Sequence, residues 1–142
     1  MKEGAFLKYI RVYQFFWKKR LKFFAKLMML FGRILFSCDI PPSCTIGKNT
    51  SFPHYGLGVV IHPRCKIGDN CKLYQNVTIG SRNGQGPPVI GNNVLVESGA
   101  VILGDIKIGD NVNIGSNSVI INNVPSNSTV VGVPGRVLKN KI

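Results

Sequence analysis

Two histidines are the residues of this chain best suited to acid–base chemistry near neutral pH. His54 and His62 are the only histidines among its 142 residues, and imidazole is the side chain whose ordinary pKa lies closest to physiological pH. A carboxylate, Asp39, precedes His54 by fifteen residues. An imidazole that is oriented by a carboxylate can remove a proton from a hydroxyl group.

The elements that would position these residues follow a six-residue repeat. A large aliphatic or aromatic residue recurs every six positions in three runs, which are Ile40, Ile46 and Phe52, then Ile61, Ile67, Leu73 and Ile79, and then Ile90, Val96, Ile102, Ile108, Ile114 and Ile120. This period fits neither an amphipathic helix nor a simple alternating strand. It fits three-sided coils of short strands, each pointing one large residue inward, with Gly, Asn or Asp at the corners. Residues 40–131 then supply about five coils of eighteen residues.

Two breaks interrupt the repeat, and breaks in a regular solenoid are where function tends to lie. The step from Phe52 to Ile61 is nine residues long and contains His54. The step from Ile79 to Ile90 is eleven residues long and predicts a protruding loop over residues 81–88. Because fifteen residues are close to one coil, Asp39 and the histidine in the first break can approach each other in space.

The repeat, together with the ending Gly132-Val133-Pro134-Gly135-Arg136-Val137, resembles the hexapeptide-repeat acyltransferases, and within them the serine acetyltransferase-like branch. The resemblance covers roughly residues 38–139. It implies a mainly β fold, a left-handed parallel β-helix, which is an exception to the usual right-handed crossover. It also implies a homotrimer with active sites between neighbouring subunits, and acetyl-CoA as donor. We expect a short α-helical segment over residues 1–36 and the β-helical acetyltransferase domain over residues 37–142.

The resemblance also assigns the catalytic residues. In this family an Asp orients the catalytic His, and Cys38-Asp39-Ile40-Pro41-Pro42 resembles the segment that carries it. It implies a dyad in which Asp39 fixes the imidazole and His54 deprotonates the acceptor hydroxyl as it attacks the thioester. The competing interpretations are a loop histidine without a role for His54 and a turn residue for Asp39. His62 is expected to point outward at a coil corner, with the base or a substrate contact as its other interpretation.

For the coenzyme, the resemblance implies contacts with the backbone of the coil wall and with a few cations. Gly80 and the second break flank the donor in relatives, and Gly99, Ala100 and Ser116 stand where successive coils line the pantetheine channel. Arg136 and Lys139 resemble the cations that meet the phosphates. A solvated terminal cation is the other interpretation of Arg136.

The second break departs from true serine acetyltransferases. Those enzymes use an Arg-His pair for serine recognition where this chain has Gly86 and Pro87, so the carboxylate of a free amino acid lacks its expected partner. We therefore expect O-acetylation of a sugar or polysaccharide precursor, with a glycan or other small-molecule acceptor. Serine O-acetylation in cysteine biosynthesis is the alternative, and a non-catalytic β-helical scaffold is the second alternative.

Positive charge is concentrated in the N-terminal segment. Of the formal +12, residues 1–36 hold +8, from nine Lys or Arg and one Glu interleaved with large aromatic residues. The segment reads as helix, broken near Gly32. Two interpretations stay open, a helix lying at an anionic membrane surface and an arm packed on the same or a neighbouring subunit. No nucleic-acid motif accompanies the charge, and no apolar run reaches the roughly 18 residues that cross a bilayer.

The four cysteines predict neither a metal site nor a disulfide framework. No C-x-x-C pair exists, and Cys44, Cys65 and Cys71 occupy the small inward place of their repeats, where a thiol behaves as a compact hydrophobic group. Reduced thiols and the lack of a signal peptide favour a cytoplasmic protein, peripheral at the inner face of the membrane if the basic segment binds lipid.

Overall fold

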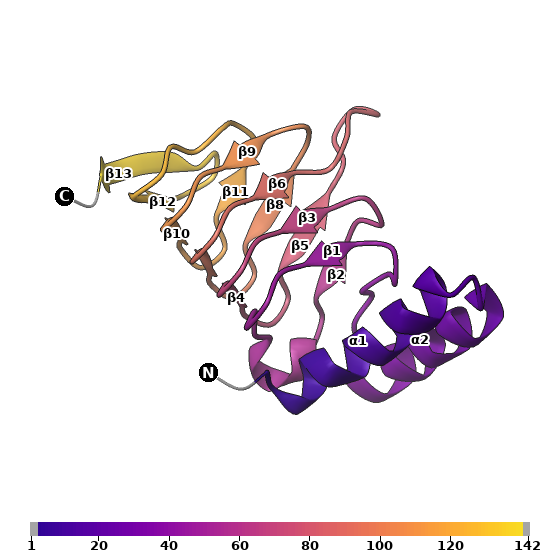
Figure 1. Ribbon diagram of the computed structural model, residues 1–142. Coiled ribbons are helices and arrows are strands. Elements are labelled where there is room, and N and C mark those ends of the chain that lie inside the picture. The colour runs from indigo at the N-terminus through magenta and orange to yellow at the C-terminus, as the bar shows by residue number, and fades with distance from the viewer. Residues whose placement is uncertain (1–2, 141–142) are drawn as a thin grey trace.

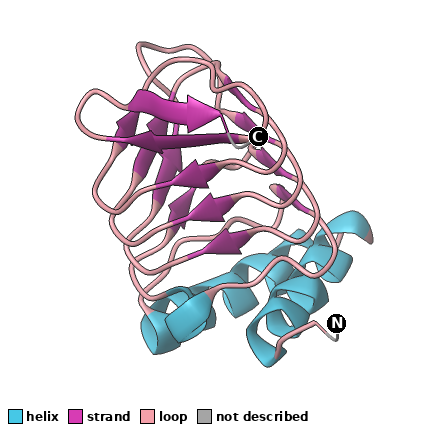
Figure 2. Ribbon diagram, turned by 90° about the vertical axis from the view of Figure 1, so that its left-hand side faces the viewer, coloured by secondary structure: helices cyan, strands magenta, loops and turns pink. Residues whose placement is uncertain are grey.

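The computed structural model describes residues 3–140, and their side chains as far as Leu138. From Asp39 to Val131 the chain forms a parallel β-helix of three-sided coils stacked along one axis, with two helices below the first coil (Figures 1 and 2). The strand register pairs each repeat with the equivalent repeat of the next coil, so that Ile61 lies beside Ile79 and Ile79 beside Ile102.

Each side of the prism is one sheet, and we name the three sides as faces. Face A consists of β2 (Val60–Ile61), β5 (Thr78–Gly80), β8 (Val101–Leu103) and β11 (Val119–Ile120). Face B consists of β1 (Thr45–Ile46), β3 (Lys66–Ile67), β6 (Val89–Ile90) and β9 (Lys107–Ile108). Face C consists of β4 (Lys72–Leu73), β7 (Leu95–Val96), β10 (Asn113–Ile114), β12 (Ser128–Val131) and β13 (Arg136–Asn140), the last antiparallel to β12.

The core confirms the six-residue repeat. All thirteen repeat positions are buried, the most exposed being Phe52 at 7%. The small fifth places are buried as well, from Cys44 at the first coil to Val124 near the last. One aliphatic column therefore runs the length of the prism, and its burial drives the stacking of the coils.

Asparagine makes many of the corners. Eight Asn residues, among them Asn93, Asn111 and Asn127, have positive φ angles of 52–60°. Asn tolerates this left-handed conformation better than most residues. The Asn93 amide donates to Asn111 Oδ1 (3.2 Å) and the Asn111 amide donates to Asn127 Oδ1 (3.0 Å). The corner between faces B and C is thus a ladder of side-chain amides that keeps the coils in register.

Helix α1 (Ala5–Lys18) closes the open end of the core. Its buried side includes Leu7 and Ile10, which join the hydrophobic column of the prism. Polar groups on the same side bind first-coil carbonyls: the Tyr13 hydroxyl donates to Ile40 O (2.8 Å), and the Arg11 guanidinium donates to Ile46 O (2.7 Å) and Gly47 O (2.8 Å). These bonds satisfy backbone acceptors that have no coil below them.

Helix α2 (Lys22–Phe36) follows a short turn and packs beside α1. The chain reverses between the helices at residues 19–21, where Arg20 adopts a φ of 61°. The predicted break near Gly32 is therefore wrong, because Gly32 lies buried inside α2. A Cβ at this position would lie 3.0 Å from Tyr9 Cε1. Glycine serves close helix packing here, and the break arises from the left-handed Arg20.

Candidate active site

The first break forms a strained turn, η1 (Pro53–Gly56). His54, Tyr55 and Gly56 follow one another in the left-handed region, with φ angles of 56°, 55° and 67°. For residues other than glycine this conformation costs about 1–3 kcal/mol each, and it persists only where the surroundings fix it. The Tyr55 ring stacks on Phe36 of α2 (5.8 Å between centroids) and meets Phe6 of α1 edge-on (6.4 Å). Both helices thus hold the turn that presents His54.

The imidazole of His54 is exposed and makes no side-chain hydrogen bond or ion pair with any residue that the structure describes. It borders a cavity of about 370 Å³, together with residues from α1 and from the strand segment around Thr50 and Lys72. Both ring nitrogens are thus free, and one can accept a proton from a substrate hydroxyl.

Asp39 lies on face A, where its backbone bridges to Val60. Its Oδ2 forms an ion pair with Arg33 Nη2 of α2 (3.3 Å). No hydrogen bond joins Asp39 to His54, and the two line different cavities. Within one chain the predicted dyad is therefore not formed, and the partner of the carboxylate is a cation of helix α2 to which the six-residue repeat does not point.

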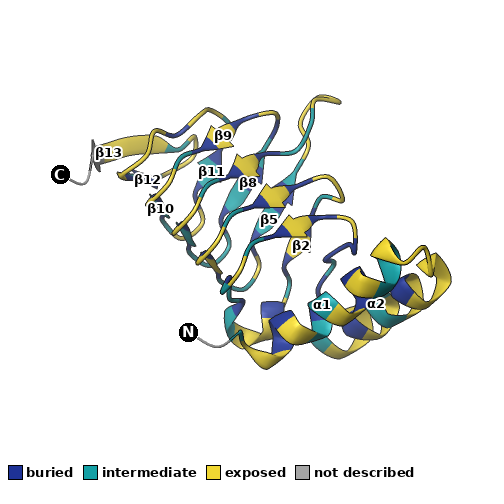
Figure 3. Ribbon diagram, in the orientation of Figure 1, coloured by how far each residue is buried: buried dark blue, intermediate teal, exposed yellow. Residues whose placement is uncertain are grey.

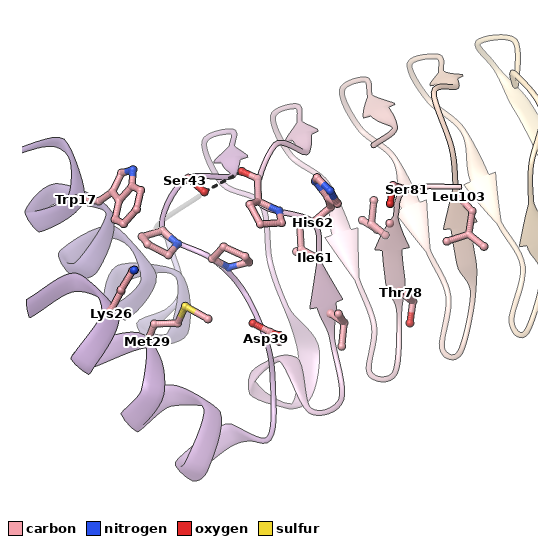
Figure 4. Close-up of a pocket in the computed structure, with 16 residues that line it drawn as sticks. Trp17, Lys26, Met29, Asp39, Ser43, Ile61, His62, Thr78, Ser81 and Leu103 are labelled. Atoms are coloured by element: carbon pink, nitrogen blue, oxygen red, sulfur yellow. Dashed lines mark hydrogen bonds between the residues drawn. The ribbon is translucent and has the colours of Figure 1, made fainter. Parts of the chain in front are cut away.

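A larger cavity, of about 660 Å³, lies between the helical pair and face A (Figure 4). Figure 4 shows Trp17, Lys26 and Met29 on the helix side of this cavity, and Thr78 and Leu103 on the strand side. Asp39, His62, Gly80 and Ser81 line it as well. The strand residues flank inward repeat positions, so the repeat could have identified them. Trp17 and Lys26 carry no such signal, because helix packing alone brings them here.

His62 occupies a regular unit, and one of its nitrogens is already used. The backbone N–H of Arg64 donates to His62 Nδ1 at 3.1 Å. In the neutral ring the proton then resides on Nε2, which makes that atom a hydrogen-bond donor. The Nε2–H of His62 can therefore donate a hydrogen bond to an oxygen of a substrate in the larger cavity. The ring is poorly suited to act as a base there.

The predicted coenzyme residues fall on two edges of face A. Gly80 and the loop 81–88 lie at the edge between faces A and B, which we call the loop edge. Gly99 and Ser116 lie at the edge between faces C and A, as does the turn with His54, so we call it the His54 edge. Backbone bonds stack its turns: Asn76 N donates to Leu57 O (2.8 Å) and Asn117 N donates to Ser98 O (2.9 Å).

The residues predicted to bind the coenzyme differ in how far they are exposed. Ser116 is exposed. Gly99 has a φ of 71°, and a Cβ there would collide with Asn117 Oδ1, so both residues belong to corner turns. Ala100 is fully buried, and its carbonyl accepts the N–H of Thr78 (3.0 Å). The prediction that Ala100 lines a ligand channel does not fit this interior position. Gly80 has no side chain, so the wall of the larger cavity is flat at this position, where a Cβ would lie 3.3 Å from Leu103 Cδ2.

The second break is a tight hairpin. Arg82 and Gln85 exchange two backbone hydrogen bonds, of 3.3 and 2.9 Å, around Asn83 and Gly84, which both have positive φ. Asn-Gly is the sequence typical of such a two-residue turn. Arg82 is exposed, as is Arg136 on β13, and the side chain of Lys139 lies outside the described residues.

All four cysteines are free and buried. Burial is the main cause that raises the pKa of Cys44 and Cys65 to about 12 and that of Cys38 to about 11, and it also raises the pKa of Cys71. At neutral pH these thiols are protonated and are not nucleophiles. Among the described residues, no three His, Cys, Asp or Glu side chains gather in a cluster that could hold a metal ion.

Comparisons with known proteins agree with this architecture. Residues 87–122 match the family model of the bacterial transferase hexapeptide (six repeats). The serine acetyltransferase of Staphylococcus xylosus is 46% identical over 126 residues, which are 87% of this chain and 58% of that protein. Brucella abortus serine acetyltransferase in complex with coenzyme A superposes with a TM-score of 0.91 at 29% identity, over 96% of this chain and 55% of that one. Neisseria gonorrhoeae serine acetyltransferase in complex with serine gives 0.88 at 29% identity, over 94% and 55%.

These relatives support some predictions and shift others. The chain spans a little over half the length of the relatives it matches. The solved neighbours are left-handed β-helices, which confirms the predicted fold class. The names of these relatives specify serine as their acceptor, which is the acceptor of the predicted alternative, and not a sugar or polysaccharide. The chain therefore carries the bacterial transferase hexapeptide repeat over residues 87–122, on a β-helix that is similar to those of serine acetyltransferases.

Proposed function

We propose that the protein is an acetyl-CoA-dependent O-acetyltransferase and that L-serine is its best-supported acceptor. The observation that carries this proposal is the His54 turn, which presents an exposed and unpaired imidazole from a backbone under strain. Strained turns of this kind cluster at active sites. Support for the donor and the acceptor comes from relatives whose names specify serine acetyltransferase and from a neighbour solved with coenzyme A.

The proposed reaction needs one base. The acceptor hydroxyl oxygen attacks the thioester carbonyl carbon while its proton passes to the His54 imidazole. The C–S bond then breaks, and the thiolate of coenzyme A takes up that proton. We keep Asp39 as the proposed positioning residue. No hydrogen bond joins it to His54 within the described chain, but the ion pair that Arg33 makes with its Oδ2 leaves Oδ1 free. Removal of such a base typically costs about 10² to 10⁴ in rate.

We further propose that the site is completed by a second copy of the chain in a homotrimer. Within one chain, His54 lies at one edge of face A, while Gly80 and the loop 81–88 lie at the other. Face A carries no Lys, Arg, Asp or Glu on its strands, and Val60 is exposed there. Strands that carry no charged residue are suited to contact with another subunit, which would bring its loop edge to the His54 edge of this chain.

A glycan acceptor stays as the second candidate because of one observation. Gly86 and Pro87 offer no cation to a serine carboxylate, and Arg82 is the only cation of the loop 81–88. If serine is the acceptor, the exposed Arg82 guanidinium is the group of this loop that can pair with its carboxylate.

The test is release of coenzyme A from acetyl-CoA in the presence of L-serine, of sugar nucleotides or of oligosaccharides. We expect the highest kcat/KM with L-serine, and a rise in the KM for serine in Arg82→Ala. A matched control is Arg64→Ala, which removes an exposed cation outside the loop. Faster turnover with a glycan would reassign the acceptor, and no turnover with any acceptor would favour the scaffold.

A further inference from the structure

Helix α2 exposes an apolar surface that nothing in the described chain covers. Only Ala25 and Gly32 of this helix are buried, and Phe23, Ile34 and Leu35 are 72%, 71% and 69% exposed. The exposed large apolar residues of α2, which we call the outer face, are Phe23, Phe24, Leu27, Leu30, Phe31, Ile34 and Leu35. Figure 3 shows the contrast with the coils, whose inner positions are buried. Single exposed apolar residues are normal, but a contiguous set of this kind marks an interaction site.

The outer face has the geometry of an interfacial helix. At about 100° per residue, its seven side chains fall within an arc of roughly 140° on the side opposite Ala25 and Gly32. Lys22, Lys26 and Arg33 lie together along one border of that arc. No helix of the described chain is long and apolar enough to cross a membrane. An apolar face bordered by cations is the pattern of a helix that lies in the plane of a membrane surface.

The positive charge around the outer face of α2 indicates which kind of partner this surface can bind. The end of α1 and the turn after it add further cations, Lys18, Lys19 and Arg20, all of them exposed. The only acid of residues 3–36 is Glu3, and it forms an ion pair with Arg11 (3.3 Å). A second copy docked on the same face would bring two sets of cations together, and of these cations only Arg33 has a carboxylate partner in the described chain, Asp39. Anionic head groups would neutralise these cations while the rings and aliphatic chains enter the acyl layer.

We propose that the outer face of α2 binds the surface of an anionic lipid bilayer. The helical pair lies at the end of the prism where the first coil begins, so the coils extend away from the bound surface (Figure 1). The larger cavity is lined by Lys26 and Met29 of α2, so it opens beside the membrane. The proposal is independent of the acceptor, since it rests on the helices alone.

The test is sedimentation of the full chain with vesicles of two compositions, phosphatidylcholine alone and phosphatidylcholine with about 30% phosphatidylglycerol. We expect partition onto the anionic vesicles, weakened by added salt because screening acts on exposed charges. The apolar variant is Phe23→Ser with Ile34→Ser, and its matched control at the other end of the prism is Val133→Ser with Leu138→Ser, which are 70% and 62% exposed. We expect the α2 variant to lose partition by about tenfold or more, and the control variant to keep it.

A charge variant separates lipid electrostatics from general stickiness. Lys22→Glu with Lys26→Glu should lower partition about tenfold or more. Lys66→Glu with Lys107→Glu, which changes two exposed cations on face B, is the control and should lower it less. Unchanged melting temperatures in all variants exclude unfolding as the cause.

Three results would overturn the proposal. The first is no partition onto anionic vesicles, and the second is equal partition onto both vesicle types. The third combines two observations: the wild-type chain does not bind vesicles, and in vesicle-free solution it forms an oligomer that dissociates in the variant Phe23→Ser with Ile34→Ser. That result would assign the outer face to a second copy of the chain.

Discussion

The two histidines differ in their place in the repeat and in the hydrogen-bond partners of their imidazole rings. His54 lies in a break of the repeat, on three consecutive left-handed residues, and its ring has no partner among the described residues. His62 lies in a regular unit, and a backbone N–H binds its Nδ1. The regular repeat thus fixes the tautomer of one imidazole, while the break leaves the other free to accept a proton. In this prism, chemistry depends on where the repeat fails.

The largest expected effect distinguishes the two rings. His54→Ala should lower kcat for acetyl transfer by about 10² to 10⁴, because it removes the base. His62→Ala is the matched control and should lower kcat by less than about tenfold, with its main effect on the KM of the acceptor. Steady-state kinetics of both variants check this. A larger kcat loss in His62→Ala than in His54→Ala would reverse the assignment.

The strain of the break can be tested through its glycine. Gly56→Ala adds a Cβ that would lie 2.8 Å from the Phe6 ring at a φ of 67°. We expect a loss of about 2–4 kcal/mol in the free energy of unfolding. Gly86→Ala is the control, because a Cβ there meets nothing within 4 Å and the backbone is ordinary. Denaturant unfolding of both variants measures the difference, and equal stabilities would show that the turn is not held tightly.

A smaller effect tests the two partners of Asp39. Asp39→Asn should lower kcat about tenfold to a hundredfold if the carboxylate orients His54, because the neutral amide still accepts a hydrogen bond but lacks the negative charge that stabilises the protonated imidazole. Arg33→Ala removes only the ion pair with Asp39, which is partly exposed, and should change stability by less than about 1 kcal/mol. Equal losses of kcat in the two variants would indicate that the ion pair, and not a dyad, positions the site.

The smallest expected effect concerns the buried thiols, which should react slowly with labelling reagents in the native protein. Because burial raises the pKa of Cys44 and Cys65 to about 12, only about one thiol in 10⁴ is ionised at pH 8. A disulfide reagent should modify these thiols only after unfolding. The raised pKa also contributes stability that is present below the ordinary pKa of 9.0 and is lost as pH rises through about 12. Rapid labelling of the native protein would contradict this account of the core.

The sequence predicts the prism well and the helices poorly. A repeat is a local pattern, so positions such as Ile67 and Ile108 were identifiable as core without any knowledge of contacts. The helical pair has no repeat, and its turn depends on Arg20, which carries no turn signal in the sequence. Gly32 was misleading because glycine serves both breaks and close packing.

The candidate site was predicted only in part. His54 was found because it lies in a break, but the support of Tyr55 by Phe36 and Phe6 joins residues far apart in sequence. The ion pair of Asp39 with Arg33 is long-range packing of the same kind. A dyad inferred from spacing alone cannot anticipate a competing cation from another element.

The final strand gives the prism a finite length. A stack of parallel coils exposes unpaired backbone at its last coil, where another chain could add and extend it into a filament. Here β13 turns back antiparallel on β12 at one end, and α1 covers the first coil at the other. End-to-end growth is blocked at α1 and hindered at β13, so the coils can stack without seeding fibres.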